Sequence, residues 1–343
     1  MKRAIILTGM VCFLYVFLAM SGTSSAQGDK PIELRFSHWM SPMHNLHVGV
    51  FAPFAKDLEE RTKGRVKMTI YPGEALGKAK DHYDMIAQGM TDMGMFIQGY
   101  TAGRFPLTSV IELPIQVPSG KVGSRVIWEL YGRYLKQEYP GVKLLTLWTH
   151  DPGHLHMAKK PVRKLDDLKG VRLRSPGPVQ MQVIKELGGS PLTLPVPELY
   201  DSLQRGMVDG TVIGFSAVKD FKLYEVLKYH TFANLYVMPM GMAINPKTWD
   251  SLPPDVQKII EDLTGARMAG TAGASFDQYD LIGQDFAKKA GAEFITLSPE
   301  EQKKWIDRIK PLNDKWVADM EGKGLPGKKI FEEASQLVQK YSK

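Results

Sequence analysis

The sequence predicts a fold of two α/β lobes around a ligand cleft, with hinge crossings between the lobes and a helical C-terminal region. Stretches with strand and helix periodicity alternate in two blocks, residues 32–149 and 153–233, which is typical of α/β domains with largely parallel sheets. An apolar run over 235–243 can carry the chain back to the first block. Ligands of such sheets bind at the carboxyl ends of the strands, between the lobes.

The first block follows a regular order of strands and helices. Alternating polar and apolar residues indicate the strands, apolar positions at helical spacing indicate the helices, and Pro72-Gly73 ends the second strand. The expected strands are 32–38, 66–71, 92–96 and 142–149, and the expected helices are about 46–61 and 79–88.

The sequence changes character at 150–153, and from Trp249 onward it is mostly helical. The stretch 250–253 predicts a helix start, because a cap residue precedes a proline in the first turn. About 317 residues follow Ala26, more than the ~250–300 at which a single core stops growing. We therefore expect lobe I to comprise 27–151 and 238–280, and lobe II to comprise 152–237 and 281–343.

The N-terminus indicates export. Lys2 and Arg3 precede an apolar run over 4–20, and small polar residues lead to Ala26. This order predicts a cleaved signal peptide over residues 1–26 and a periplasmic protein. The single cysteine, Cys12, lies inside the apolar run, so the mature chain would have no disulfide and no thiol chemistry.

Composition and motifs argue against several classes of function. The formal net charge is +7, and the basic residues are interleaved with acidic ones, so we expect no nucleic-acid partner. The sequence has no H-E-x-x-H zinc motif and no phosphate-cradling loop, and the residues around Ser216 lack the closing glycine of a nucleophile elbow. We expect neither an enzyme nor a cofactor or metal.

Arg174 is the strongest candidate for a binding residue. It ends a short predicted strand and is followed at once by Ser-Pro-Gly. A guanidinium is always charged and offers a planar fork of donors that matches a carboxylate. The alternative is an arginine paired with a surface Asp or Glu. Arg172 lies two residues earlier and would share the same face, but Arg174 is closer to the strand end.

Several motifs occur in the order found in one family of binding proteins. They are F-A-x-x-L-E-E-R-T-K-G-R-V (54–66), D-L-K-G-V-R-L-R (167–174), Y-D-S-L-Q-R-G-M-V-D-G (200–210) and W-D-S-L-P-P-D-V-Q-K (249–258). The mature chain resembles the periplasmic solute-binding subunit of a tripartite ATP-independent periplasmic (TRAP) transporter, of the DctP-like family. The resemblance implies a bilobal, periplasmic-binding-protein-like fold that closes on an organic acid and delivers it to TRAP membrane permease subunits. It also implies that Arg174 is the family's carboxylate-binding arginine.

The chain departs from well-known members of this family at three positions. Trp39 stands where a polar residue is common, Ile213 replaces a common asparagine near Phe215, and His154 and His156 lie where a second arginine often occurs. These changes predict an apolar pocket for a monocarboxylate with an aromatic or branched body. Candidate ligand-binding residues are Arg174, Trp39, Gln98, His154, His156, Ile213 and Phe215, with His44 and His150 as weaker candidates at its border.

Alternatives remain for each of these interpretations. His154 and His156 can be structural histidines at the hinge or, less favourably, a metal pair; Trp39 can be a core anchor and Gln98 a loop cap. The ligand can be a sulfonate or a dicarboxylate. The protein can also serve an ATP-driven importer or a sensor. A monomer is the simplest expectation.

Overall fold

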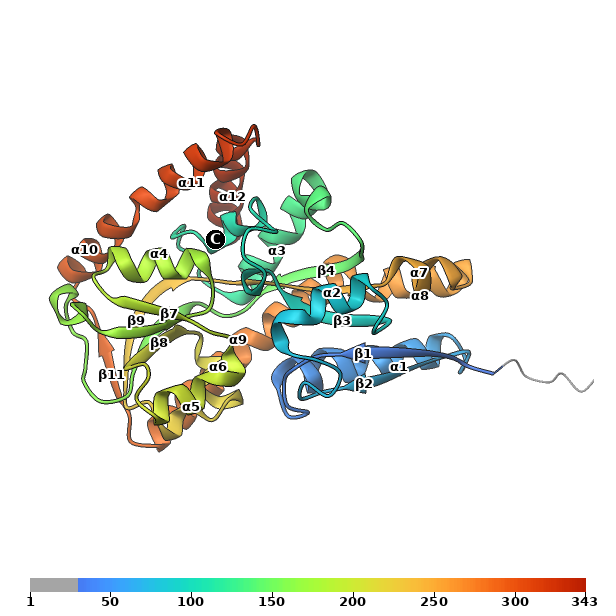
Figure 1. Ribbon diagram of the computed structural model, residues 1–343, viewed down its shortest axis with the longest axis horizontal. Helices are drawn as coiled ribbons and strands as arrows, with labels where there is room; N and C mark the ends of the chain where they lie inside the picture. The colour runs from blue at the N-terminus through green and yellow to red at the C-terminus, as the bar shows by residue number, and fades with distance from the viewer. Residues whose placement is uncertain (1–29) are drawn as a thin grey trace, which may run out of the picture. The chain divides into compact units, whose positions relative to one another are not determined.

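The computed structural model describes residues 30–343 (Figure 1). The predicted signal peptide, residues 1–26, lies outside the described residues. The first sheet has five strands in the order β2-β1-β3-β10-β4. β1 pairs in parallel with β2 and β3, whereas β10 pairs antiparallel with both β3 and β4. The strands of this sheet are β1 (Ile32–Ser37), β2 (Val66–Tyr71), β3 (Met93–Ile97), β4 (Lys143–Thr149) and β10 (Pro239–Ile244).

The second sheet has six strands in the order β11-β9-β5-β8-β6-β7. β6 runs parallel to β7 and β8, whereas β5 runs antiparallel to β8 and β9. Both sheets are therefore mixed rather than largely parallel. The strands are β5 (Gly153–Met157), β6 (Arg172–Ser175), β7 (Ser190–Thr193), β8 (Gly210–Ile213), β9 (Tyr229–Tyr236) and β11 (Glu293–Thr296).

Helices surround both sheets, and the two predicted α/β blocks are confirmed. No helix within residues 30–343 combines the length and apolar character needed to cross a membrane. The helices are α1 (Ala52–Arg61), α2 (His82–Ala87), α3 (Gly120–Leu130), α4 (Pro178–Glu186), α5 (Leu199–Gln204), α6 (Phe215–Asp220), α7 (Pro246–Ser251), α8 (Pro254–Leu263), α9 (Gly265–Lys289), α10 (Pro299–Ile309), α11 (Pro311–Glu321) and α12 (Gly327–Tyr341).

The start of the helical C-terminal region differs from the prediction. Asn245 caps α7, because its side-chain oxygen accepts hydrogen bonds from the backbone N–H groups of Lys247 (2.9 Å) and Thr248 (3.3 Å). Asp250 therefore lies inside α7, and the next helix, α8, begins at Pro254. The predicted cap signal at 250–253 marks the break between these two helices.

The chain crosses between the two sheets three times: where β4 leads into β5, where β9 leads into β10, and between β10 and β11, through α9. The long helix α9 packs against α3 and β4 of the first block and against α6 of the second. Asp277 of α9 fixes the start of α3, since its carboxylate accepts hydrogen bonds from the N–H groups of Gly120 (2.6 Å) and Lys121 (3.0 Å). The last helix, α12, packs against α3. The limits of the two lobes remain a prediction.

A buried acid joins elements attached to the two sheets. Glu112 lies at the end of a short 3-10 helix (Thr108–Glu112), and its carboxylate accepts a hydrogen bond from Gln180 Nε2 of α4 at 2.9 Å. Burial raises the pKa of Glu112 to about 7. The stability that protonated Glu112 contributes is therefore fully present below its unfolded pKa of about 4.3 and is lost as pH rises through about 7.

Glu112→Gln should stabilise the protein at alkaline pH, because glutamine keeps the acceptor for Gln180 but cannot ionise. We expect a gain of about 2 kcal/mol in the free energy of unfolding near pH 8 and almost none near pH 4.5. Urea denaturation at the two pH values measures this difference. Glu60→Gln, at an exposed acid of α1, is the control and should show no such pH dependence. An equal effect of Glu112→Gln at both pH values would contradict the prediction.

Candidate functional site

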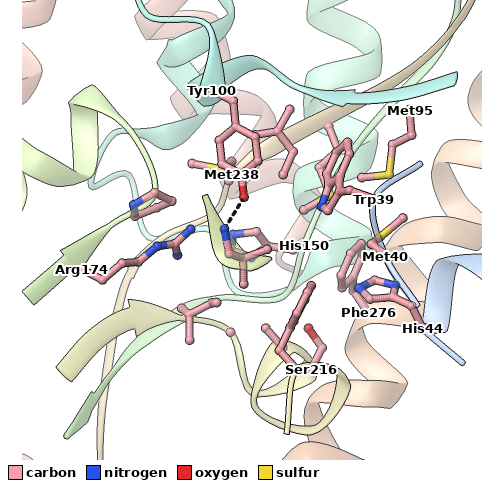
Figure 2. Close-up of a pocket in the computed structure, with 18 of the residues that line it drawn as sticks. Trp39, Met40, His44, Met95, Tyr100, His150, Arg174, Ser216, Met238 and Phe276 are labelled. Atoms are coloured by element: carbon pink, nitrogen blue, oxygen red, sulfur yellow. Dashed lines mark hydrogen bonds between the residues drawn. The ribbon is translucent and has the colours of Figure 1, made fainter. Parts of the chain in front are cut away.

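A pocket lies between the two sheets, next to the β4–β5 and β9–β10 crossings (Figure 2). It is lined by residues from the first block, by residues from the second, and by Phe276 of α9. Apolar side chains make up most of its wall, so a ligand there would lose most of its contact with water. The main apolar members are Trp39, Met40, Met95, Met238, Met240 and Phe276.

Arg174 supplies the positive charge of this pocket. It lies near the carboxyl end of β6, where the parallel neighbours β7 and β8 hold the strand in place. The residue is only 1% exposed, and its Nε donates to the carbonyl oxygen of Leu194 at 2.9 Å. Within residues 30–343, no carboxylate lies within 4.0 Å of its guanidinium. A buried cation without a counter-ion is costly, so this geometry favours an anionic ligand.

Arg172 behaves differently although it lies on the same strand. Its side chain is 51% exposed and forms an ion pair with Asp209, with Nη2 at 2.6 Å from Oδ1 and Nε at 3.1 Å from Oδ2. The surface pairing considered as the alternative for Arg174 is thus found at Arg172. Of these two arginines, only Arg174 lines the pocket.

Trp39 and Ile213 also line the pocket. The Trp39 ring lies with its centroid 5.9 Å from that of Tyr100 and 5.2 Å from that of His82. Tyr100 links the two blocks, because its hydroxyl accepts a hydrogen bond from the N–H of Val196 at 3.0 Å. Burial raises the pKa of the Tyr100 hydroxyl, although the nearby charge of Arg174 acts in the opposite direction.

The predicted residues His154, His156 and Phe215 do not line this pocket. His154 and His156 share one face of β5, as their spacing predicts, but both rings pack against Phe215. His154 Nδ1 accepts from the N–H groups of Ala233 and Asn234. His156 Nε2 contacts the carbonyl oxygen of Ile213 at 2.9 Å. The period of a strand shows which residues share a face but not which face meets the ligand.

Gln98 is also turned away from the pocket. Its Nε2 donates to the hydroxyl of Tyr139 at 3.1 Å, within the first block. Within residues 30–343, no group of three or more His, Cys, Asp or Glu residues is placed to hold a metal ion. We therefore build the candidate site on Arg174, Trp39 and Ile213, and leave out Gln98 and the two histidines of β5.

Other pocket residues come from parts of the chain that carry no common motif. Tyr100 lies in a short 3-10 turn, Tyr236 ends β9, and Phe276 lies in the middle of α9. Burial raises the pKa of the Tyr236 hydroxyl, which donates to the carbonyl oxygen of Val212 at 3.0 Å. Sequence patterns do not identify these three residues, because only the fold brings them together. His44 and His150 do border the pocket.

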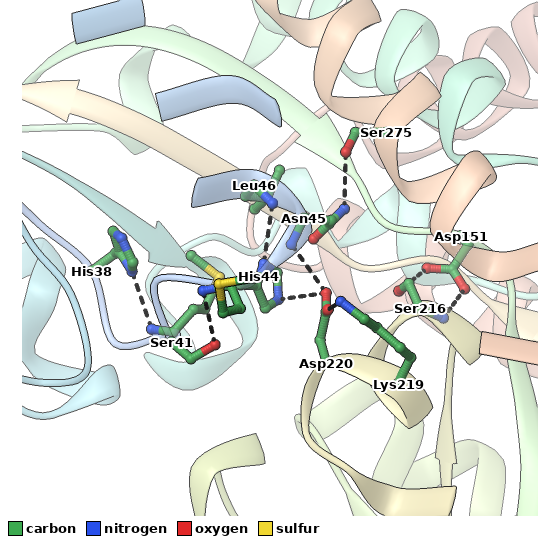
Figure 3. Close-up of polar contacts among 12 residues, drawn as sticks. His38, Ser41, His44, Asn45, Leu46, Asp151, Ser216, Lys219, Asp220 and Ser275 are labelled. Atoms are coloured by element: carbon green, nitrogen blue, oxygen red, sulfur yellow. Dashed lines mark hydrogen bonds and ion pairs between the residues drawn. The ribbon is translucent and has the colours of Figure 1, made fainter. Parts of the chain in front are cut away.

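Polar contacts hold the two blocks together around the pocket (Figure 3). The N–H of Asn45 donates to Asp220 Oδ2 of α6 at 3.2 Å, and Lys219 Nζ pairs with Asp220 Oδ1 at 2.8 Å. At the first crossing, Asp151 accepts hydrogen bonds from Ser216 Oγ (2.5 Å) and Ser216 N (3.2 Å). Burial raises the pKa of Asp151, and the neighbouring Asp280 raises it further.

Residues 36–319 match the family model for bacterial extracellular solute-binding proteins of family 7, called DctP. The chain belongs to this family. The predicted resemblance to TRAP solute-binding subunits is therefore confirmed, and members of the DctP family are extracellular solute-binding proteins rather than enzymes.

Similar DctP-type proteins span nearly the whole chain. The 2,3-diketo-L-gulonate-binding periplasmic protein YiaO of Escherichia coli K12 is 28% identical over 292 residues, which cover 81% of this chain and 84% of YiaO. A TRAP solute-binding protein of Rhodoferax ferrireducens T118, solved with copurified benzoate, is 28% identical to this chain, with a TM-score of 0.88. The match covers 91% of this chain and 98% of that one.

A second similar structure confirms the bilobal fold. A TRAP periplasmic solute-binding protein of Bordetella bronchiseptica, solved with bound (R)- and (S)-mandelate, is 26% identical with a TM-score of 0.85. The match covers 91% of this chain and all of that one. The ligands named for the three proteins are all small organic acids, and they differ from one another.

Proposed function

We propose that this protein binds a small monocarboxylate with an aromatic or branched apolar body in the periplasm, as a monomer, and delivers it to the membrane permease of a TRAP transporter. One observation carries the proposal. Arg174 is buried beside an apolar pocket and has no carboxylate partner within residues 30–343. A ligand carboxylate would supply the missing counter-ion, and its apolar body would contact Trp39 and the methionines of the wall.

Capture would proceed by hinge closure. In an open form, the crossings at 149–153 and 236–239 would act as hinges that let the lobes separate and admit the ligand to Arg174. Closure would make the contacts seen between the blocks, such as Tyr100 with Val196 and Asn45 with Asp220. It would also remove water, which strengthens the ion pair because the local dielectric constant falls.

The comparisons support the aromatic class without deciding it. The proteins solved with benzoate and with mandelate are both more than 25% identical to this chain. YiaO, whose name states a sugar-acid ligand, is equally similar. A sugar acid presents several hydroxyl groups, and the apolar wall described above offers them few partners. A sulfonate remains the second candidate, because its oxygens can also pair with a guanidinium.

A thermal-shift screen of the mature protein tests this proposal. The panel would contain aromatic and branched monocarboxylates, benzenesulfonate as the partner of benzoate, dicarboxylates, and sugar acids. A ligand present at 100 times its Kd adds about 2.7 kcal/mol to the stability, which shifts Tm visibly. We expect the largest shift with an aromatic or branched monocarboxylate. A shift only with dicarboxylates or sugar acids would contradict the proposed ligand class.

Trp39→Ala should weaken the binding of aromatic ligands more than the binding of small aliphatic ones. The indole lines the pocket, and the loss of an aromatic contact costs about 1 kcal/mol beyond the buried area. We therefore expect about a 10-fold rise in Kd for an aromatic acid and a smaller rise for a short aliphatic acid. Isothermal titration calorimetry measures both. Equal losses for the two acids would show that Trp39 supports the lobe rather than the ligand.

A further inference from the structure

His150 follows β4 directly, at the first crossing between the sheets, and it lines the pocket. In the view of Figure 2, the residue lies between Arg174 and Trp39. The side chain is nearly buried, at 7% exposure, and is held edge-on against Tyr236 with a centroid distance of 5.3 Å. Its backbone N–H donates to the carbonyl oxygen of Met238 on the returning segment, at 3.4 Å. His150 is therefore fixed in position by the β4–β5 and β9–β10 crossings.

The contacts of the imidazole define which nitrogen carries the proton. His150 Nδ1 is hydrogen-bonded to the carbonyl oxygen of Asp151. A carbonyl oxygen can only accept, so Nδ1 must donate. Burial lowers the pKa of His150 to about 4, and the nearby charge of Arg174 lowers it too, so the ring is neutral near pH 7. In a neutral ring with a protonated Nδ1, Nε2 carries a free lone pair and accepts hydrogen bonds.

Nothing within residues 30–343 donates a hydrogen bond to His150 Nε2. The nearby hydroxyls of Tyr236 and Ser216 are directed to the carbonyl oxygen of Val212 and to Asp151. Nε2 is also absent from the fully buried polar atoms that lack a partner, so it keeps some open surface. Because His150 lines the pocket, we infer that this surface of Nε2 faces the space a ligand would fill. An acceptor in such a place requires a donor from the ligand, since an unpaired polar group in a closed site is costly.

We propose that His150 Nε2 accepts a hydrogen bond from a hydroxyl group of the ligand, so that the protein selects hydroxy acids over their deoxy analogues. The inference rests on the proposed function and specifies its ligand class. The carboxylate pairs with Arg174, and the hydroxyl, on the α-carbon or on an aromatic ring, reaches His150. The apolar remainder lies against Trp39 and the methionines.

Calorimetric titration with matched pairs of acids tests this proposal. The pairs are mandelate with phenylacetate and 3-hydroxybenzoate with benzoate, and the proteins are the wild type, His150→Phe and His150→Gln. In at least one pair, we expect the wild type to bind the hydroxy acid about 10-fold more tightly or better. In His150→Phe, the difference in Kd between the hydroxy acid and its deoxy analogue should fall below about 3-fold, because the acceptor is lost. His150→Gln should restore most of it, since the amide offers both an acceptor and a donor for the Asp151 carbonyl.

Other outcomes separate this inference from the proposed function. A pair difference that persists in His150→Phe, equal losses for both members of both pairs, or a wild type that prefers the deoxy acids would overturn the role of His150. Arg174→Ala is titrated with the same acids. If Arg174→Ala no longer binds any of these acids, while His150→Phe keeps the wild-type ratio of affinities within each pair, only the inference on His150 fails. If Arg174→Ala binds them like the wild type, the proposed function fails, whereas a wild type that binds neither pair overturns the inference on His150.

Discussion

Arg174→Ala is expected to raise the Kd for the ligand by about 100-fold or more, a loss of about 3 kcal/mol. The guanidinium is buried and has no carboxylate partner within residues 30–343. In the variant, a ligand carboxylate would enter an apolar pocket without its charged partner. Calorimetric titration with the best monocarboxylate from the screen measures the change, and thermal unfolding of the free protein shows whether the variant is folded.

Two further variants sharpen this result. Arg174→Lys should also weaken binding markedly, because a point charge does not reproduce the two parallel donors of a guanidinium. Arg172→Ala is the matched control, since Arg172 lies on the same strand but is exposed and paired with Asp209. Its effect on Kd should be within about 2-fold, as for most surface charges. Near-wild-type affinity of Arg174→Ala would contradict the assigned role.

Gly283→Ala is expected to destabilise the protein by about 3 kcal/mol or more. Gly283 lies on the side of α9 that packs against α6. A Cβ atom at this position would overlap the backbone carbonyl group of Phe215, the first residue of α6. Backbone cannot move aside as a flexible side chain can, so the two helices would have to separate. Urea denaturation monitored by circular dichroism measures the loss.

Gly270→Ala is the control for helix propensity in the same helix. An added Cβ at Gly270 meets no atom within 4 Å. Alanine is the better helix former by about 1 kcal/mol, so this variant should be as stable as the wild type or slightly more stable. Equal stability of Gly283→Ala and Gly270→Ala would contradict the close packing of α6 on α9. Because Ser216 of α6 lines the pocket, a loosened α6 should weaken ligand binding as well.

The sequence was sufficient to predict the two α/β blocks, because strand and helix periods are local properties. It did not reveal that β10 pairs antiparallel between β3 and β4, since the partners of a strand depend on residues far away in the chain. The start of the helical C-terminal region was also misplaced: a helix start was predicted at 250–253, whereas α7 already begins at Pro246. Asn245 is an equally good cap residue, and local signals do not rank two neighbouring caps.

The candidate site was predictable only where a residue type and its position agree. Arg174 lies near the end of β6 and Trp39 lies just after β1, and both line the pocket. His154 and His156 also lie together on a strand, but their face is covered by Phe215. Tyr100 and Phe276 reach the pocket from a turn and from the middle of a helix. No spacing rule connects such positions, because tertiary packing alone defines them.

The most direct test of the central claim is a crystal structure of the mature protein with the monocarboxylate that gives the largest thermal shift. We predict that the ligand carboxylate lies against Arg174, with guanidinium nitrogens and carboxylate oxygens about 2.7–2.9 Å apart, and that the apolar body contacts Trp39. A ligand whose carboxylate binds elsewhere in the pocket, with Arg174 free or paired to a protein acid, would contradict the account.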